Sequence, residues 1–260
     1  MDLGLTAAGF GVGLLVGLTG MGAGSLMTPI LITVFGIPAS TAVGTDLVYA
    51  AITKAFGAAR HHQLKNVNKE LALWMATGSV PAAFAGSYVL YNVFGEGIND
   101  WLPNVIGFTL VAVGIAVAIR TFVTIRGLWD ASKLPTDGPL TTRHKTYAVI
   151  IGVFFGFILG LTSVGSGVFF GMTLVTLFPL SARRVVGTDL LHAFLVTCAA
   201  GLGTVLFGVP NYGYVGAILI GSIPGILIGS HFTNRLPERA LRGSIAGVLA
   251  LSGMKLLGAF

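Results

Sequence analysis

Two glycine-rich strings contain the residue types with which a protein binds a small anion. The first runs from Thr19 to Ser25 and the second from Thr162 to Gly167. Alternating glycines break a helix, and a helix that restarts after the break exposes unpaired N–H groups and the positive end of its dipole. An anion can approach those groups closely because glycine has no Cβ. We therefore predict that both strings hold an oxyanion with neutral donors. The predicted substrate-binding residues are Thr19, Gly20, Gly22, Gly24, Ser25, Thr162, Ser163, Gly165, Ser166 and Gly167.

A different role is expected for Gly9, Gly13 and Gly17, which recur at every fourth position. Small residues at this spacing line one face of a helix and let a second helix approach closely. We predict that these three glycines serve helix packing. The same packing role is the alternative explanation for the glycines between residues 20 and 24.

Asp46 and Asp189 each follow a Gly-Thr pair inside an apolar segment. One explanation is local: the threonine caps a helix that starts there, and the acid lies in the first turn. The other is that the acids bind protons during transport, because ionisable groups inside a membrane are costly and usually functional. An ionised aspartate would repel an oxyanion, so neither acid is predicted to be a direct ligand.

Three further side chains join the aspartates as candidate coupling or gating residues. His192 shares a helix face with Asp189 and either pairs with it or is a buried histidine of the core. Tyr49 occupies the position equivalent to His192 in the repeat described below. Lys54 either extends its ammonium to the membrane surface or attracts the anion along a polar path.

The composition places these residues in a membrane protein. Of the 260 residues, 54% are hydrophobic and 9% are charged, and the mean hydropathy is +0.89. A soluble domain carries about 25% charged residues. The single cysteine, Cys198, excludes an intramolecular disulfide and a cysteine-rich metal site. No catalytic residue, metal site or cofactor is predicted.

Charged residues divide the chain into segments, of which two are too long for one crossing. Residues 3–45 and 146–182 carry no charge, whereas a helix crosses the bilayer with about 20 residues. Each must turn at its glycine-rich string and continue as a short piece, at 25–36 and 168–179. The other predicted spans are 43–60, 71–94, 101–122, 186–207, 213–234 and 239–259.

The basic residues predict the orientation in the membrane. All of the 15 except Lys54 and Lys255 lie in four connections, and lysine and arginine mark cytoplasmic loops. The alternating connections have none, so both termini are predicted to be external. The same placement argues against nucleic acid as a partner, despite the net charge of +6.

A repeat with an offset of 143 residues runs through most of the chain without a gap. It aligns Gly44-Thr45-Asp46-Leu47 with Gly187-Thr188-Asp189-Leu190, and Gly78-Ser79 with Gly221-Ser222. The uncharged loop before Gly44 reads as external, whereas Arg183 and Arg184 make the loop before Gly187 cytoplasmic. The two copies are therefore predicted to enter the membrane from opposite sides, as in many secondary transporters.

The predicted fold is an all-α polytopic membrane protein built from two inverted-topology repeats. Each repeat has a broken or short-helix hairpin plus three spanning helices, which gives about 8–10 transmembrane segments. Residues 1–125 form the first repeat, 126–145 a cytoplasmic linker, and 146–260 the second, inverted repeat.

These motifs, found twice in order, resemble the sulfite exporter TauE/SafE family. The resemblance covers essentially the whole chain. It lies in Gly13-x3-Gly17-Leu-Thr-Gly-Met-Gly-Ala-Gly, Pro29, Gly36-x-Pro38, Ala42-x-Gly44-Thr45 and Arg60-His61-His62. It implies transport of sulfite, sulfoacetate or a related organosulfur anion.

We therefore expect a transporter of the plasma (inner) membrane, not an enzyme, which moves a small sulfur oxyanion or sulfonate outward by alternating access. Lipids are expected partners, and proton coupling is a further hypothesis. The principal alternative is a passive channel for small anions or neutral solutes. A serine protease is disfavoured, because Val164-Gly165-Ser166-Gly167 lacks the first glycine of the intramembrane-protease motif.

Overall fold

The computed structural model describes residues 2–19, 26–94, 97–125, 138–165, 167–232 and 238–258. Within these ranges every regular element is helical. The elements are α1 (Leu3–Thr19), α2 (Met27–Thr33), α3 (Ala39–Gln63), α4 (Lys69–Tyr88), the π-helical turn η1 (Val89–Val93), α5 (Ile98–Ile125), α6 (Thr142–Thr162), α7 (Phe169–Leu177), α8 (Ala182–Phe207), α9 (Tyr212–Phe232) and α10 (Glu238–Leu256). The all-helical class and the two short helices, α2 and α7, agree with the prediction.

The two central helices begin earlier than predicted. The carbonyls of Pro38 and Ser181 accept the first helical hydrogen bonds, from Ala42 and Val185. The polar turns that precede the apolar segments are therefore part of the helices. Asp46 and Asp189 lie beyond the first turn, so the explanation of Gly-Thr-Asp as a helix start is wrong.

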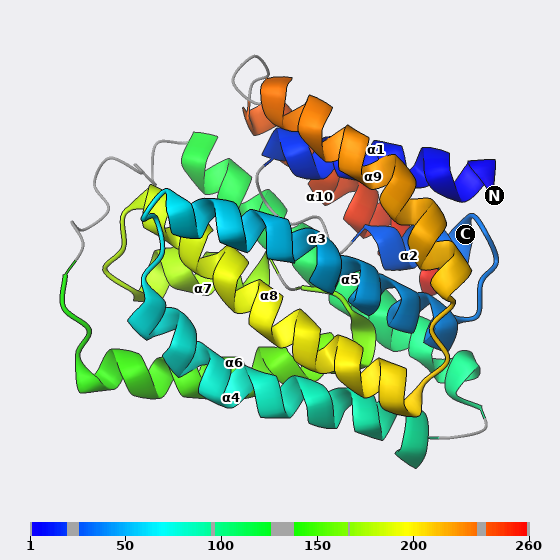
Figure 1. Cartoon of the computed structure of the whole chain (residues 1–260), viewed down its shortest axis with the longest axis horizontal. Coiled ribbons are helices and arrows are strands. Elements are labelled where there is room, and N and C mark those ends of the chain that lie inside the picture. The colour runs from blue at the N-terminus through cyan, green and yellow to red at the C-terminus, as the bar shows by residue number, and fades with distance from the viewer. Residues whose placement is uncertain are drawn as a thin grey trace.

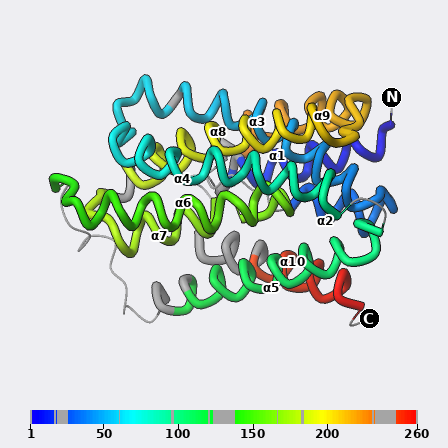
Figure 2. Tube along the Cα trace, turned by 90° about the horizontal axis from the view of Figure 1, so that it is seen from below, coloured from blue at the N-terminus to red at the C-terminus, as the bar shows by residue number. Residues whose placement is uncertain are grey.

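The helices pack as pairs around a central crossing. α3 lies against α8, α1 against α9, α4 against α6, and α5 against α10 (Figure 1). Figure 2, seen from below, shows α5 and α10 together as a separate layer on one side of the molecule. Segments far apart in the sequence thus meet in every pair, and α3 with α8 forms the centre.

Glycines allow two of these pairs to approach backbone to backbone. A Cβ on Gly13 would meet the backbone of Ser222, and a Cβ on Gly156 would meet the backbone of Ser79. Gly9 likewise faces the backbone of Ile218. The packing role predicted for Gly9 and Gly13 is therefore confirmed. The two glycine–serine contacts are related by the offset of 143 residues found in the sequence.

Helices that correspond under this offset run in opposite directions in the view of Figure 1. α1 runs from right to left and α6 from left to right, and α3 and α8 are opposed in the same way. The contact of α1 with α9 corresponds to that of α6 with α4. We call α1–α9 and α4–α6 the outer helix pairs. Each half of the chain contributes one helix to each of them.

Four helices of the described chain are long and apolar enough to cross a membrane. These stretches are Ile98–Ile119, Thr142–Thr162, Arg184–Phe207 and Tyr212–Gly229. Leu3–Val16 and Ala246–Leu256 are shorter apolar helices. Large apolar side chains such as Phe108, Phe154 and Leu227 are exposed, as expected of a surface that faces lipid.

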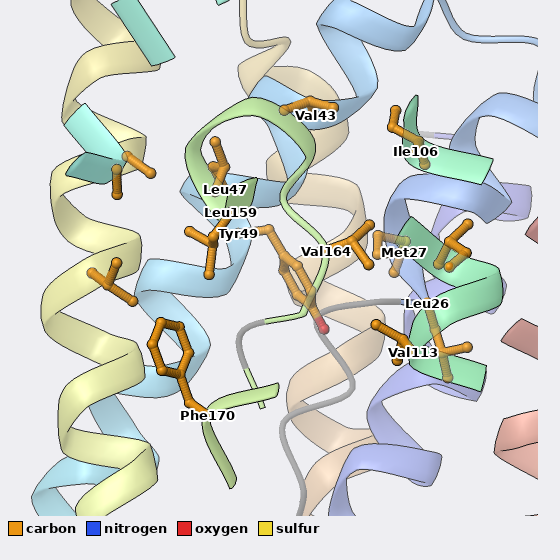
Figure 3. Close-up of a cluster of buried hydrophobic side chains, with 14 of the residues drawn as sticks. Leu26, Met27, Val43, Leu47, Tyr49, Ile106, Val113, Leu159, Val164 and Phe170 are labelled. Atoms are coloured by element: carbon orange, nitrogen blue, oxygen red, sulfur yellow. The ribbon is translucent and has the colours of Figure 1, made fainter. Parts of the chain in front are cut away.

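The core lies where the short helices meet the central pair. Figure 3 shows Tyr49 of α3 beside Val164, which follows α6, with Phe170 of α7 nearby. Met27 of α2 and Leu47 of α3 are fully buried in the same cluster. The polar residues considered next are embedded in this apolar surrounding.

Candidate substrate and coupling site

The second glycine-rich string forms a break between α6 and α7. Ser163 ends α6 in the left-handed conformation, with φ 59°, and Gly165 has φ +98°. Glycine suits the second position because a side chain there would be strained and would meet the ring of Phe169. The predicted break is therefore present here. Thr19 ends α1, and its predicted partners Gly20, Gly22, Gly24 and Ser25 lie outside the described residues, as does Ser166.

The polar groups at this break are engaged within the protein. The Ser163 amide donates to the Leu159 carbonyl at 2.7 Å. The Thr162 hydroxyl donates to the Ile158 carbonyl at 2.8 Å and accepts from the Val164 amide at 3.2 Å. An anion that entered this segment would have to compete with these internal bonds.

Asp46 is bound directly to the break. Its Oδ2 accepts from the Ser163 hydroxyl at 3.0 Å and from the Thr28 hydroxyl of α2 at 2.5 Å. The carboxylate is fully buried, and its Oδ1 has no hydrogen-bond partner among the described residues. A predicted substrate residue and a predicted coupling residue are thus joined. Thr28 was not singled out from the sequence, because only folding brings α2 against α3.

Lys54 lies inside the protein, with a side chain 5% exposed. Its ammonium interacts electrostatically most strongly with Asp189 and more weakly with Asp46. The alternative in which Lys54 reaches the membrane surface therefore does not hold in this structure. Asp189 lies against α7, where a Cβ on Gly171 would be 3.7 Å from its Oδ2.

His192 and Tyr49 each lie beside a serine of an outer helix pair. His192 Nε2 is hydrogen-bonded to the Ser79 hydroxyl at 2.7 Å, and its ring stacks edge-on against Phe170 at 4.3 Å. Tyr49 lies close to Ser222, whose hydroxyl donates to the Leu219 carbonyl at 3.5 Å. Ser79 and Ser222 are equivalent under the repeat, as are His192 and Tyr49. The aligned Gly-Ser pairs were a sequence signal for these serines, although their hydroxyls were not assigned a role.

The threonines of the Gly-Thr-Asp motifs hold the connections to neighbouring helices. The Thr188 hydroxyl accepts from the Asn68 amide at 2.9 Å, and the Thr45 hydroxyl accepts from the Asn211 amide at 3.2 Å. Asn68 is the N-cap of α4. The threonines therefore fix α4 and α9 to the central helices instead of capping their own.

Replacing Ser79 with alanine should destabilise the protein by about 1–3 kcal/mol, because the buried His192 Nε2 loses its partner. The measurement is thermal or chemical unfolding of purified protein in detergent. Thr77→Ala is the matched control on the same helix, since the exposed Thr77 hydroxyl bonds only the Trp74 carbonyl of its own helix. Equal effects of the two substitutions would contradict a role for the Ser79–His192 bond.

Comparison with known proteins assigns this architecture to a family. The sequence profile described as "Sulfite exporter TauE/SafE" matches residues 5–256. The chain belongs to the sulfite exporter TauE/SafE family. Members of this family are membrane transporters and not enzymes, which confirms the resemblance noted in the sequence. No solved structure shows a significant match to this TauE/SafE chain.

Three curated relatives match this TauE/SafE chain over nearly its full length. "Probable membrane transporter protein YjnA" of Bacillus subtilis is 41% identical over 99% of the chain and 100% of the relative. "Probable membrane transporter protein YdhB" of the same organism is 29% identical, over 95% of the chain and 97% of the relative. "Probable membrane transporter protein MJ0441" of Methanocaldococcus jannaschii is 26% identical, over 97% and 94%. The chain is therefore a membrane transport protein.

Proposed function

We propose that this protein is a secondary transporter that exports a small sulfur-containing anion, such as sulfite, sulfoacetate or a related sulfonate, across the plasma (inner) membrane. The observation that carries the proposal is the buried link between Asp46 and Ser163. It joins an ionisable group to a helix break of the kind that transporters use for substrates. Membership of a family described as sulfite exporters supports the substrate class.

The proposed transport cycle uses residues 1–125 and 146–260 as two inverted repeats, joined by the linker 126–145. The opposite course of α1 and α6 in Figure 1 supports the inversion. The matching glycine–serine contacts at Gly13 and Gly156 also support it. Rocking of one half against the other would expose the central site to each side in turn. In this proposal both termini are external, and the basic connections are cytoplasmic.

The substrate site is proposed to comprise both glycine-rich strings, with Asp46, Asp189, Lys54, His192 and Tyr49 as coupling or gating residues. An anion near the middle of a membrane needs donors and a nearby positive charge. Lys54 supplies this charge as the positive end of its pair with Asp189 within the α3–α8 crossing, and the strings supply neutral donors. Binding to neutral donors suits a carrier, since the ligand must also leave.

Counterflow in proteoliposomes tests this function. Vesicles loaded with unlabelled sulfite should accumulate labelled sulfite transiently and saturably, because a carrier exchanges the two isotopes one for one. Sulfoacetate and thiosulfate should compete, whereas acetate should not. Flux without saturation or counterflow would identify a passive channel instead.

Gly22→Leu should remove at least about 90% of this counterflow, since a side chain would keep the anion from the backbone N–H groups. Gly11→Leu is the matched control, because a Cβ at Gly11 meets nothing within 4 Å. Titration calorimetry with sulfite separates binding from turnover. Unchanged sulfite affinity of folded Gly22→Leu protein would refute the assignment of the first string.

A further inference from the structure

The central crossing contains more buried negative charge than positive charge. The buried carboxyl, amino and imidazole side chains of the described chain are those of Asp46, Asp189, Lys54 and His192, and His192, hydrogen-bonded to the Ser79 hydroxyl, is counted as neutral. With the other three ionised, the crossing would hold one uncompensated negative charge. An isolated charge in an apolar interior is so costly that the group is normally neutralised instead. One of the two carboxyl groups must therefore be neutralised, and the contacts of each show which one.

Lys54 compensates the charge of Asp189 more than that of Asp46. α3 and α8 run antiparallel, so that Gly57 lies beside Leu190 and Gly44 lies beside Thr204. Lys54 therefore faces the first part of α8, and Asp189 is its strongest electrostatic partner. Asp46 is eight residues before Lys54 on the same helix, which corresponds to about 12 Å along the axis.

The repeat places no cation in the corresponding position near Asp46. The offset of 143 residues that relates Asp46 to Asp189 relates Lys54 to Thr197. The Thr197 hydroxyl donates to the Ala193 carbonyl of its own helix at 2.6 Å. Asp46 has instead two hydroxyl partners, Thr28 and Ser163, for which the repeat has Gly171 and Gly20. One carboxyl is thus matched with an ammonium group and the other with neutral hydroxyls.

We propose that Asp46 carries the proton that is coupled to anion transport, while Lys54 and Asp189 form a fixed ion pair. The inference rests on the proposed transport function and adds to it the group that binds the proton. Hydroxyls can donate to the Oδ2 of a neutral carboxyl as well as to a carboxylate. The Oδ1 atom, fully buried and without a hydrogen-bond partner among the described residues, is where the proton binds.

The surroundings of Asp46 contain few other groups that titrate. α2 and residues 163–165 contribute none. Tyr91 of η1 donates its hydroxyl to the Ser40 carbonyl, near the start of α3. Tyr214 lies at the start of α9, next to the contact of Asn211 with Thr45. α3 and α8 also carry Tyr49, Lys54, Asp189, His192 and Cys198, and, at the ends of these helices that lie far from Asp46, Arg60, His61, His62, Arg183 and Arg184.

Competition for the Ser163 hydroxyl would couple anion binding to proton binding. A serine hydroxyl has one proton to donate, so Ser163 can serve Asp46 or a bound anion but not both at once. When an anion takes this donor, the Asp46 carboxylate loses stabilisation and binds a proton more strongly. Anion and proton would therefore bind together.

Infrared spectroscopy tests the assignment without requiring transport. Purified protein in detergent or lipid is titrated with acid, and the carbonyl stretch of a protonated, buried carboxyl group is followed. The wild-type protein should show this band, and Asp46→Asn should lose it. The double variant Lys54→Met/Asp189→Asn is the matched control, because it removes the neutral pair and should keep the band. Asp46→Glu should move the band in frequency and so provides the assignment even if Asp46→Asn does not fold.

A second experiment introduces a cation opposite Asp46 and follows the same infrared band. Thr197→Lys reproduces the position of Lys54 in the other half and should lower the pH at which the band appears by about 1 unit or more.

A band that persists in Asp46→Asn, or that disappears in the double variant, would assign the proton to another group. The absence of a band in the wild-type protein would overturn the proposal, since Asp46 would then be neutralised by something other than a proton. Counterflow without a band would leave the transport function standing and reject only this inference.

Discussion

Gly221→Ala should destabilise the protein by about 3 kcal/mol, the upper end of the usual cost of overpacking. A Cβ on Gly221 would meet the Thr6 carbonyl oxygen and lie 2.8 Å from the Phe10 amide nitrogen. Both obstacles belong to the backbone of α1, which cannot rotate away as a side chain can. The α1–α9 pair must therefore separate, and the small-residue contact that holds it is lost.

The measurement is the unfolding midpoint and the yield of monodisperse protein in detergent. Gly216→Ala is the matched control on α9, where a Cβ meets nothing within 4 Å. It should be neutral or stabilising by up to about 1 kcal/mol, because alanine favours helix more than glycine does. If the two variants unfold alike, close backbone packing does not hold α9 in place.

Lys54→Met should abolish transport and destabilise the protein by about 3–5 kcal/mol, the usual effect of removing one partner of a buried ion pair such as the one proposed for Lys54 and Asp189. The substitution leaves Asp46 and Asp189 buried with no cation between α3 and α8. It also removes the positive charge that an anion would meet at the crossing. Stability and anion flux should therefore fall together.

A second substitution separates these two effects. Lys54→Met/Asp189→Asn restores neutrality and should recover most of the stability, whereas transport should remain lost. The double-mutant cycle isolates the interaction free energy between Lys54 and Asp189, which single substitutions do not measure. Lys145→Met is the control: its bridge to Glu70 measures 2.8 Å but is partly exposed, so about 1 kcal/mol or less is expected. A Lys54→Met protein as stable and active as the Lys145→Met protein would rule out the buried pair.

Much of the fold could be predicted from the sequence because bilayer physics constrains it strongly. A charge-free run as long as residues 146–182 must turn, and the structure has the turn between Thr162 and Phe169. The helix bounds were less accurate at the central pair, because polar turns that precede an apolar segment can continue its helix. Ala39 and Ala182 therefore start α3 and α8 ahead of the predicted bounds.

The candidate site could be predicted only in part. Asp46, Asp189 and Lys54 stand out in the sequence, because charge is rare in an apolar segment. Thr28, a partner of Asp46, does not stand out, since hydroxyl residues are common in helices. Thr28 and Ser79 acquire a role only because α2 reaches Asp46 and α4 reaches His192.

The amino-acid sequence by itself determined that this is an apolar helical chain with a repeat and with glycine-rich breaks, because composition and periodicity follow directly from the order of residues. Which carboxyl group meets Lys54 was decided by the tertiary structure alone. The antiparallel contact of α3 and α8 brings Lys54 to Asp189, while Asp46 lies two turns away on the helix that carries the lysine. Charge compensation depends on distance through an apolar interior, and that distance is set by how the helices cross.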